Sequence, residues 1–286
     1  MNYSESMIQS FKNCPRQARY KYDLRLEKEK EDKDEHHLKY GSAGHASLEV
    51  LYKGGSVSES KKAFKEIYPR QLDTEDNAKT ESNWFNLIDT YEKGQLREDL
   101  RRYEILESEK YDKFEFAGEE GFVVKLDMII RDRQDGGIYG LDWKITGGSK
   151  AYLPQDKFWG QFNPNSQITK YMASIKSKYG HCAGFFVHGF GMGYRSRAYK
   201  GEPAGTWFRH QRMEFNRTPD QLEEEERDTR EWIGRVEYAK SHNEWPKNTQ
   251  SCMFCEFKPI CQAGYQWPED RELIEITYRQ KELYAR

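Results

Sequence analysis

The stretches GFVVKLDMIIRD (121–132) and GIYGLDWKIT (137–146) decide the fold of this chain of 286 residues. Apolar and polar residues alternate along both stretches, and this period of two is typical of β-strands. The turn signal QDGG (134–137) stands between them, so we expect the two strands to form a hairpin. A β-sheet therefore begins in the middle of the chain.

Helical periodicity, with apolar residues three and four positions apart, surrounds this hairpin. We predict helices at 4–22, 44–52, 57–111, 165–179 and 218–241, with Asn163 and Pro164 as the cap and first turn of the fourth. Further strands are expected at 182–190 and 206–215. This order predicts an α/β fold in which a central mixed β-sheet, containing the 121–131 and 137–145 strands, is flanked by helices.

A single domain over residues 1–286 is expected, with two additions to its central sheet. Residues 57–111 are predicted to be a helical insert, and residues 245–267 a cysteine-rich C-terminal cap. No internal repeat or low-complexity linker points to a second domain. The mixed-charge run EKEKEDKDEHH (27–37) shows no period, and we interpret it as a solvated loop or helix extension.

Composition and charge restrict the function only weakly. The formal net charge is −2 at pH 7, so a nucleic-acid partner would be held in a local groove rather than by a uniform positive field. No apolar run approaches the roughly 20 residues that span a bilayer, and the first residues lack the apolar core of a signal peptide. We therefore expect no membrane partner and a cytoplasmic location, in the host cytoplasm if the source is a virus.

Asp142 and Lys144 form a D-x-K motif in the second predicted strand. Residues two apart in a strand point to the same face, and the hairpin brings Asp127 of the partner strand toward them. Two carboxylates and one ammonium group suit phosphodiester hydrolysis, because carboxylates hold Mg²⁺ or Mn²⁺ and a cation stabilises the developing charge. The tripeptide alone also fits an ordinary cross-strand ion pair.

Further residues in chain order strengthen the catalytic interpretation. His45 lies on a helix before the sheet, and Gln167 and Tyr171 stand one turn apart on the helix after it. The order His, Asp, D-x-K, Q-x-x-x-Y resembles the RecB-like branch of the PD-(D/E)XK nuclease superfamily. The resemblance covers both ends and the middle of the chain and leaves out the helical insert.

This resemblance implies a role for each matching residue. His45, Asp127 and Asp142 would bind the metal ion together with the backbone carbonyl of Trp143. Lys144 would position and activate the attacking water. Gln167 and Tyr171 would support Lys144 and the DNA backbone. Glu49 shares a helix face with His45 and is either a further ligand or a surface residue.

Four of the five cysteines form a second constellation. Cys252, Cys255 and Cys261 follow the spacing C-x2-C-x5-C, and Cys14 stands near the N-terminus. Four thiols suffice for a metal site, but spacing alone leaves zinc and an iron–sulfur cluster open. Cys182 lies in a predicted apolar strand and is expected to be a buried small residue.

Here the chain resembles the exonucleases of CRISPR adaptation and AddB-type nuclease subunits, which carry one early and three late cysteines around a [4Fe–4S] cluster. The resemblance implies such a cluster in the C-terminal cap, with Cys14 closing it. It also implies a DNA exonuclease that acts on single-stranded ends, with a recombination or CRISPR-adaptation partner. No G-x-x-x-x-G-K-[ST] motif occurs, so any helicase would be a separate protein.

Two alternatives remain open from the residues. One is a structure- or site-specific endonuclease of the same superfamily. The other is a non-catalytic iron–sulfur subunit that binds DNA, although such a subunit would have little reason to keep Asp127, Asp142 and Lys144 together.

Overall fold

The computed structural model describes residues 3–28, 36–70, 73, 78–147, 156–198 and 204–280. The chain divides into two compact units. The sheet unit comprises residues 32–112 and 124–222, and the terminal unit comprises residues 1–31, 113–123 and 223–286. The single domain expected over 1–286 stays a prediction.

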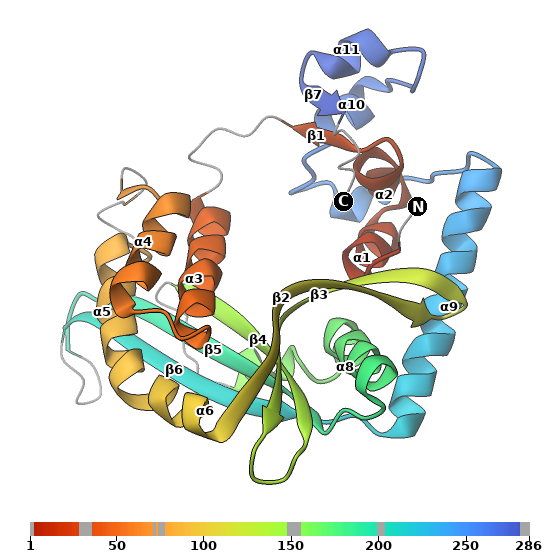
Figure 1. The fold of residues 1–286 in the computed structure, drawn as a ribbon. Helices are drawn as coiled ribbons and strands as arrows, with labels where there is room; N and C mark the ends of the chain where they lie inside the picture. The colour runs from red at the N-terminus through yellow and green to blue at the C-terminus, as the bar shows by residue number, and fades with distance from the viewer. Residues whose placement is uncertain are drawn as a thin grey trace. The chain divides into compact units, whose positions relative to one another are not determined.

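Five strands form the central sheet in the order β2-β3-β4-β5-β6 (Figure 1). They are β2 (Tyr103–Phe116), β3 (Glu119–Asp132), β4 (Ile138–Gly147), β5 (Gly184–Arg195) and β6 (Gly205–Phe215). The pairs β3–β4 and β5–β6 are antiparallel, and the pair β4–β5 is parallel. A parallel neighbour needs a crossover connection, which contains α7 (Asp156–Gly160) and α8 (Ser166–Tyr179). The predicted α/β fold with a mixed sheet is confirmed.

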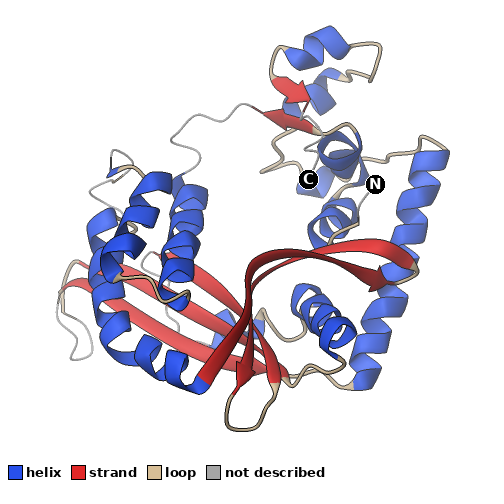
Figure 2. Cartoon of the chain, viewed as in Figure 1, coloured by secondary structure: helices blue, strands red, loops and turns tan. Residues whose placement is uncertain are grey.

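Helices cover both faces of this sheet. Successive side chains of β4 point to opposite faces, so its residues contact helices on both sides. Leu141 and Trp143 lie in the main core, to which α3 (His36–Tyr52), α4 (Val57–Ile67) and α5 (Glu81–Tyr91) contribute. These three helices lie together over the sheet in Figure 2, and Phe64 of α4 stacks on Trp84 of α5 at 5.5 Å. Gly140 faces the other side, toward Ile175 of α8.

The terminal unit joins segments from both ends of the sequence. From the N-terminal part come α1 (Glu5–Asn13), α2 (Pro15–Ala18), the π-helical turn η1 (Arg19–Asp23) and β1 (Leu26–Lys28). From the C-terminal part come most of α9 (Pro219–Ser241), η5 (Thr249–Ser251), α10 (Lys258–Ala263), α11 (Arg271–Glu275) and β7 (Tyr278–Gln280). β1 pairs with β7, and Tyr20 packs with Phe257 and Tyr278 in a small separate core.

The helical insert predicted at 57–111 is wrong in its last part. Helical structure ends with the π-helical turn η4 (Glu92–Leu96) and α6 (Arg97–Arg102), and residues 103–111 belong to strand β2. This strand lies at the edge of the sheet, and its charged side chains form ion pairs, such as Glu107 with Lys178. An edge strand does not need regular apolar alternation, so period two is hidden in its sequence.

Two other predicted helices have different ends. The helix expected at 4–22 is broken at Cys14, whose backbone is extended (φ −162°), because a residue before proline disfavours the helical conformation. Helix α8 is capped by Asn165 rather than Asn163, since the Asn165 side chain accepts a hydrogen bond from the Ile168 amide at 3.0 Å. Helix α9 begins at Pro219, one residue after the start of the helix predicted at 218–241.

Part of the sequence lies outside the described residues. This holds for 29–35, which form most of the mixed-charge run predicted to be a solvated loop. Within the described ranges, no helix is long and apolar enough to cross a membrane.

We expect Gly140→Ala to lower the free energy of unfolding by about 1–3 kcal/mol, because an added methyl group would overpack the core. A Cβ atom at Gly140 would lie 2.3 Å from the Phe185 ring and 2.9 Å from Ile175. Gly41→Ala in α3 is the matched control, since a Cβ atom there meets nothing within 4 Å. It should stabilise the helix by up to about 1 kcal/mol. Urea unfolding of both variants measures the difference, and equal midpoints would contradict the packing.

Candidate active site

Four elements of the sheet unit bring ionisable side chains to one place. They supply His45 (α3), Glu109 (β2), Asp127 (β3), and Asp142 and Lys144 (β4). Helix α3 comes close to β4 at Gly44, where a Cβ atom would lie only 2.1 Å from Ile145 Cδ1. The residue next to His45 therefore has to be small for the helix to reach the sheet.

The hairpin register positions Asp127. Met128 of β3 pairs with Leu141 of β4, so Asp127 and Asp142 are the next residues along the two strands. Asp127 Oδ2 accepts a hydrogen bond of 2.8 Å from the backbone amide of Trp143. The Asp127 carboxylate is thus tied to the strand that carries the D-x-K motif.

His45, Glu109 and Asp127 form a compact group. One ligand atom from each lies within 4.8 Å of the others. His45 Nδ1 is 3.3 Å from Asp127 Oδ1 and 3.6 Å from Glu109 Oε1. The second distance is too long for a good hydrogen bond, and Glu109 Oε1 is a buried atom with no hydrogen-bond partner. The group has the oxygen and nitrogen donors that a divalent cation binds.

Asp142 and Lys144 lie beside this group as an ion pair. Lys144 Nζ is 2.6 Å from Asp142 Oδ2, and the Asp142 side chain is only 7% exposed. Burial and the nearby negative charge of Asp127 raise the pKa of Asp142 to about 6. Burial opposes the charge on Lys144, but the carboxylates of Asp142 and Asp127 outweigh it and raise the pKa of Lys144.

His45 carries a proton while these carboxylates are its partners. Burial by itself would lower the pKa of the imidazole. The nearby carboxylates of Asp127 and Glu109 outweigh burial and raise the pKa of His45 to about 10. A cation that binds His45 must therefore displace this proton.

Gln167 and Tyr171 contact each other on α8. Gln167 Nε2 donates a hydrogen bond of 2.8 Å to the Tyr171 hydroxyl, and the Tyr171 ring stacks on Phe185 of β5 at 5.6 Å. The pair is thus held against the sheet. Their expected support of Lys144, and the expected use of the Trp143 carbonyl as a ligand, stay predictions.

Glu109 is the residue that the sequence patterns did not indicate. It falls in the stretch predicted to be helical, and its positive φ of 46° marks an irregular point in β2. Its carboxylate also forms an ion pair with Lys125 of β3. The turn at Ala117 and Gly118, directly before the hairpin, was the signal that could have revealed a third strand.

Glu49 lies at the edge of the group rather than within it. Its carboxylate pairs with Lys53 at 2.5 Å, and it is not one of the three residues whose ligand atoms lie close together. Glu49, His45, Glu109 and Lys125 line a cavity of about 380 Å³. Gly41, Ser42 and Ala46 of α3 and Ile67 of α4 also line it. The cavity gives solvent access to His45 and Glu109.

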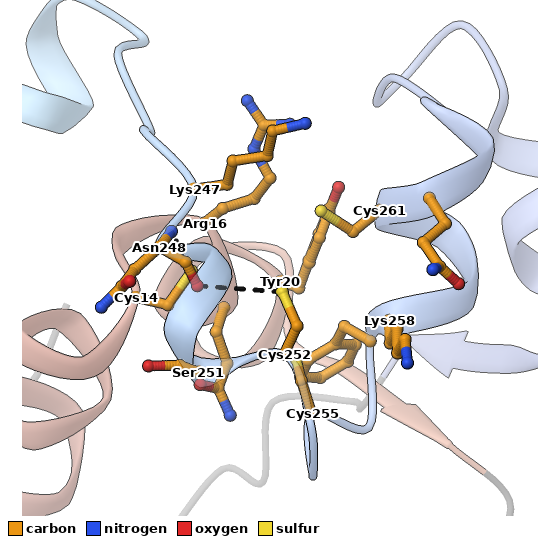
Figure 3. Close-up of a pocket in the computed structure, with 13 residues that line it drawn as sticks. Cys14, Arg16, Tyr20, Lys247, Asn248, Ser251, Cys252, Cys255, Lys258 and Cys261 are labelled. Carbon is orange, nitrogen blue, oxygen red and sulfur yellow. Dashed lines mark hydrogen bonds between the residues drawn. The ribbon is translucent and has the colours of Figure 1, made fainter.

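The terminal unit holds the four predicted cysteine ligands around one pocket (Figure 3). Cys14 Sγ accepts a hydrogen bond from the Asn248 amide at 3.4 Å, and Cys252 Sγ contacts the Asn248 carbonyl at 3.8 Å. Burial raises the pKa of Cys255, with further contributions from the neighbouring thiols. Residues from the two ends of the sequence thus meet at this pocket.

Cys182 is separate from this pocket and belongs to the sheet unit. It lies two residues before β5 instead of within the strand, because β5 begins at Gly184. The side chain is half-buried, and burial raises its pKa to about 11. The expected buried position in a strand is therefore wrong in detail, although the thiol remains a poor nucleophile.

Comparison with known protein families identifies the chain. The family description "PD-(D/E)XK nuclease superfamily" matches residues 2–262. The chain belongs to the PD-(D/E)XK nuclease superfamily. Among solved structures, a presumed exonuclease from Eubacterium rectale matches with a TM-score of 0.53 and 16% sequence identity, over 90% of this chain and 87% of the other. This likeness shows the fold. No curated protein matches the sequence.

Nucleases of this superfamily use divalent metal ions, and the residues present here fit such an ion. The fit rests on the His45, Glu109 and Asp127 donor set and on the buried Glu109 oxygen that has no hydrogen-bond partner. An acidic, partly buried group with one imidazole suits Mg²⁺ or Mn²⁺.

We expect Mn²⁺ to bind more tightly as pH rises. The pKa of His45 is about 10, so binding releases its proton throughout the neutral range. One released proton changes the affinity by about tenfold per pH unit. Below about pH 6 the slope should steepen, because Asp142 also takes up a proton. Calorimetric titration in buffers of different ionisation enthalpy measures the proton release.

His45→Gln and Glu109→Gln separate the contributions to this binding. His45→Gln should remove most of the pH dependence above pH 6 together with part of the affinity. Glu109→Gln should weaken Mn²⁺ binding and retain proton release. A pH-independent affinity of the unchanged protein would contradict ligation by His45.

Proposed function

We propose that this chain is a metal-dependent deoxyribonuclease of the RecB-like branch, acting as an exonuclease on single-stranded DNA ends. The observation that carries the proposal is the meeting of His45, Glu109 and Asp127 beside the Asp142–Lys144 pair. The superfamily match supports nuclease chemistry, and the fold likeness to a presumed exonuclease agrees with it.

His45, Asp127 and Asp142 are the proposed metal ligands, together with the carbonyl of Trp143. Glu109 joins them on the evidence of its position. A divalent ion bound here supplies positive charge at the scissile phosphate and makes water a better nucleophile. An imidazole ligand favours Mn²⁺ at least as much as Mg²⁺.

Lys144 holds the attacking water and stabilises negative charge in the transition state. Its raised pKa keeps the ammonium protonated at neutral pH. Asp142 holds this ammonium at 2.6 Å, so the cation is already in position before the substrate arrives. Gln167 and Tyr171, which hydrogen-bond to each other, orient Lys144 and the DNA backbone.

The preference for single-stranded ends rests on resemblance to end-processing relatives. A structure- or site-specific endonuclease would use the same catalytic residues. A non-catalytic DNA-binding subunit agrees less well with the close contact of Asp142 and Lys144 next to Asp127. A helicase, or a recombination or CRISPR-adaptation protein, is the proposed partner.

We expect Lys144→Ala and Asp142→Ala each to reduce cleavage by more than about 100-fold, because each removes a charge placed at the transition state. Both variants should stay folded and still bind DNA. Lys53→Ala, which removes an exposed lysine directly after α3, is the control and should keep full activity. The measurement is the rate at which an end-labelled single strand is cut with Mg²⁺ or Mn²⁺. Near-full activity of either site variant would show that the chemistry lies elsewhere.

Three substrates test the mode of cleavage in the same assay. An exonuclease should degrade a linear single strand, act less on a linear duplex and leave a circular single strand intact. Cleavage of the circle would favour the endonuclease alternative. Cleavage that continues when a chelator has removed the metal ions would contradict the metal-dependent mechanism.

We further propose that Cys14, Cys252, Cys255 and Cys261 bind a [4Fe–4S] cluster that stabilises the fold. All four cysteines line one pocket, where Cys14 from the N-terminal part meets the three late cysteines. Four thiols suffice for zinc or for an iron–sulfur cluster, and the resemblance to cluster-bearing exonucleases favours the cluster.

Purified without oxygen, the unchanged protein should be brown. The Cys255→Ala variant, purified in the same way, should be colourless and less stable. A link between distant chain segments restricts the unfolded chain, so its loss affects the whole fold. Cys182→Ala, outside the pocket, is the matched control and should keep the colour. Absorption spectra with iron and zinc analysis measure the outcome. If the analysis found stoichiometric zinc and no iron, the cluster proposal would be wrong and the four cysteines would form a zinc site.

A further inference from the structure

The turn between Cys252 and Cys255 exposes two large apolar side chains. Met253 is 78% exposed, and Phe254, at 93%, is the most exposed large apolar residue in the described part of the chain. The turn is short, since the Cys255 amide donates to the Cys252 carbonyl at 3.4 Å. Both cysteines line the pocket of the terminal unit, so the base of the turn is anchored while Phe254 points into solvent.

Cations surround the same pocket. Arg16, Lys247 and Lys258 line it, and both lysines are exposed. The side chains of Arg16 and Lys247 extend together at one side of the cysteines (Figure 3). Arg16 uses its Nε to donate to the Trp245 carbonyl at 3.1 Å, which leaves its terminal nitrogens for other acceptors.

The acidic residue nearest to Phe254 in the sequence, Glu256, does not neutralise these cations. Glu256 follows Cys255 directly and pairs with Lys21 at 3.6 Å. In the described ranges, no carboxylate forms an ion pair with Arg16, Lys247 or Lys258. Lys258 lies at the base of the turn, since its amide donates to the Cys255 carbonyl at 3.1 Å. The pocket that Cys252 and Cys255 line therefore carries positive charge at its edge, although the chain as a whole is slightly acidic.

We propose that Phe254 with Arg16, Lys247 and Lys258 forms a face that binds single-stranded nucleic acid; we name it the stacking face. The proposal rests on the proposed nuclease function and adds a substrate contact outside the catalytic residues. An exposed ring can stack on a base of any sequence, and the cations can hold the neighbouring phosphates. A single strand offers both partners at once, whereas the bases of a duplex are already stacked on each other.

The experiment measures binding apart from cleavage. Asp142→Asn serves as the parent so that the strand is not cut, and fluorescence anisotropy follows a labelled oligo-deoxythymidine. Phe254→Ala should weaken binding by about tenfold or more, the loss expected for one stacked base. Phe254→Trp should keep tight binding. Ile276→Ala, which removes another exposed apolar side chain of the same unit (79% exposed), is the control and should bind like the parent.

Salt dependence tests the cations. Lys247→Ala and Lys258→Ala should each reduce the slope of log affinity against log salt concentration by about 0.7, the value for one phosphate contact on a single strand. The metal content of every variant should equal that of the parent, which excludes damage to the cysteine site.

Unchanged affinity of Phe254→Ala would overturn the stacking face, whatever the lysine variants do. Cleavage by the unmodified chain with Mg²⁺ or Mn²⁺ is measured in parallel. If the unmodified chain cuts DNA and Phe254→Ala binds like its parent, the stacking face is wrong and the nuclease proposal stands. If the unmodified chain does not cut but Phe254→Ala loses binding, the catalytic proposal is wrong and the binding face stands.

Discussion

The hydrogen bond from the Trp143 amide to the Asp127 carboxylate is the contact on which the candidate site depends. It joins β3 to β4 at the register where Asp127 and Asp142 are neighbours. A slip of one residue would turn every side chain of β3 to the opposite face. Met128 of β3, which is buried in the main core with Leu141, opposes such a slip because the slip would remove it from this core. Burial of apolar side chains therefore keeps the acidic residues in place.

The cost of this arrangement is electrostatic. Asp127, Asp142 and Glu109 lie close together in partly buried positions, where like charges repel each other. Protonated His45 and the ammonium groups of Lys144 and Lys125 compensate the repulsion. Burial first, and then the charge of Asp127, raise the pKa of Asp142 to about 6. When His45 loses its proton, three carboxylates face only two ammonium groups, and this net negative charge favours a divalent cation.

A buried polar network contacts Trp143, the residue between Asp142 and Lys144. The Trp143 ring packs on Tyr52 at 5.4 Å, and the Tyr52 hydroxyl donates to Asp99 at 2.5 Å. Asp99 is buried and paired with Arg212 of β6. Removing one member would leave a buried charge without its partner, which is more costly than removing an exposed pair. The network thus holds the residue between Asp142 and Lys144 in one position.

Local patterns in the sequence determined the hairpin, the shared face of Asp142 and Lys144, and the C-x-x-C pair, because each depends on residues only a few positions apart. The break at Cys14 was also encoded locally, in Pro15. Strand β2 was missed because ion pairs at a sheet edge replace the apolar alternation that identifies a strand. Only the tertiary structure placed Glu109 beside His45 and Asp127, and it brings Cys14, which local patterns alone could not pair, to the pocket of the C-terminal cysteines. These contacts join residues far apart in the chain, and they depend on how whole elements pack: on the space at Gly44 that lets α3 approach β4, and on the small core where β1 meets β7.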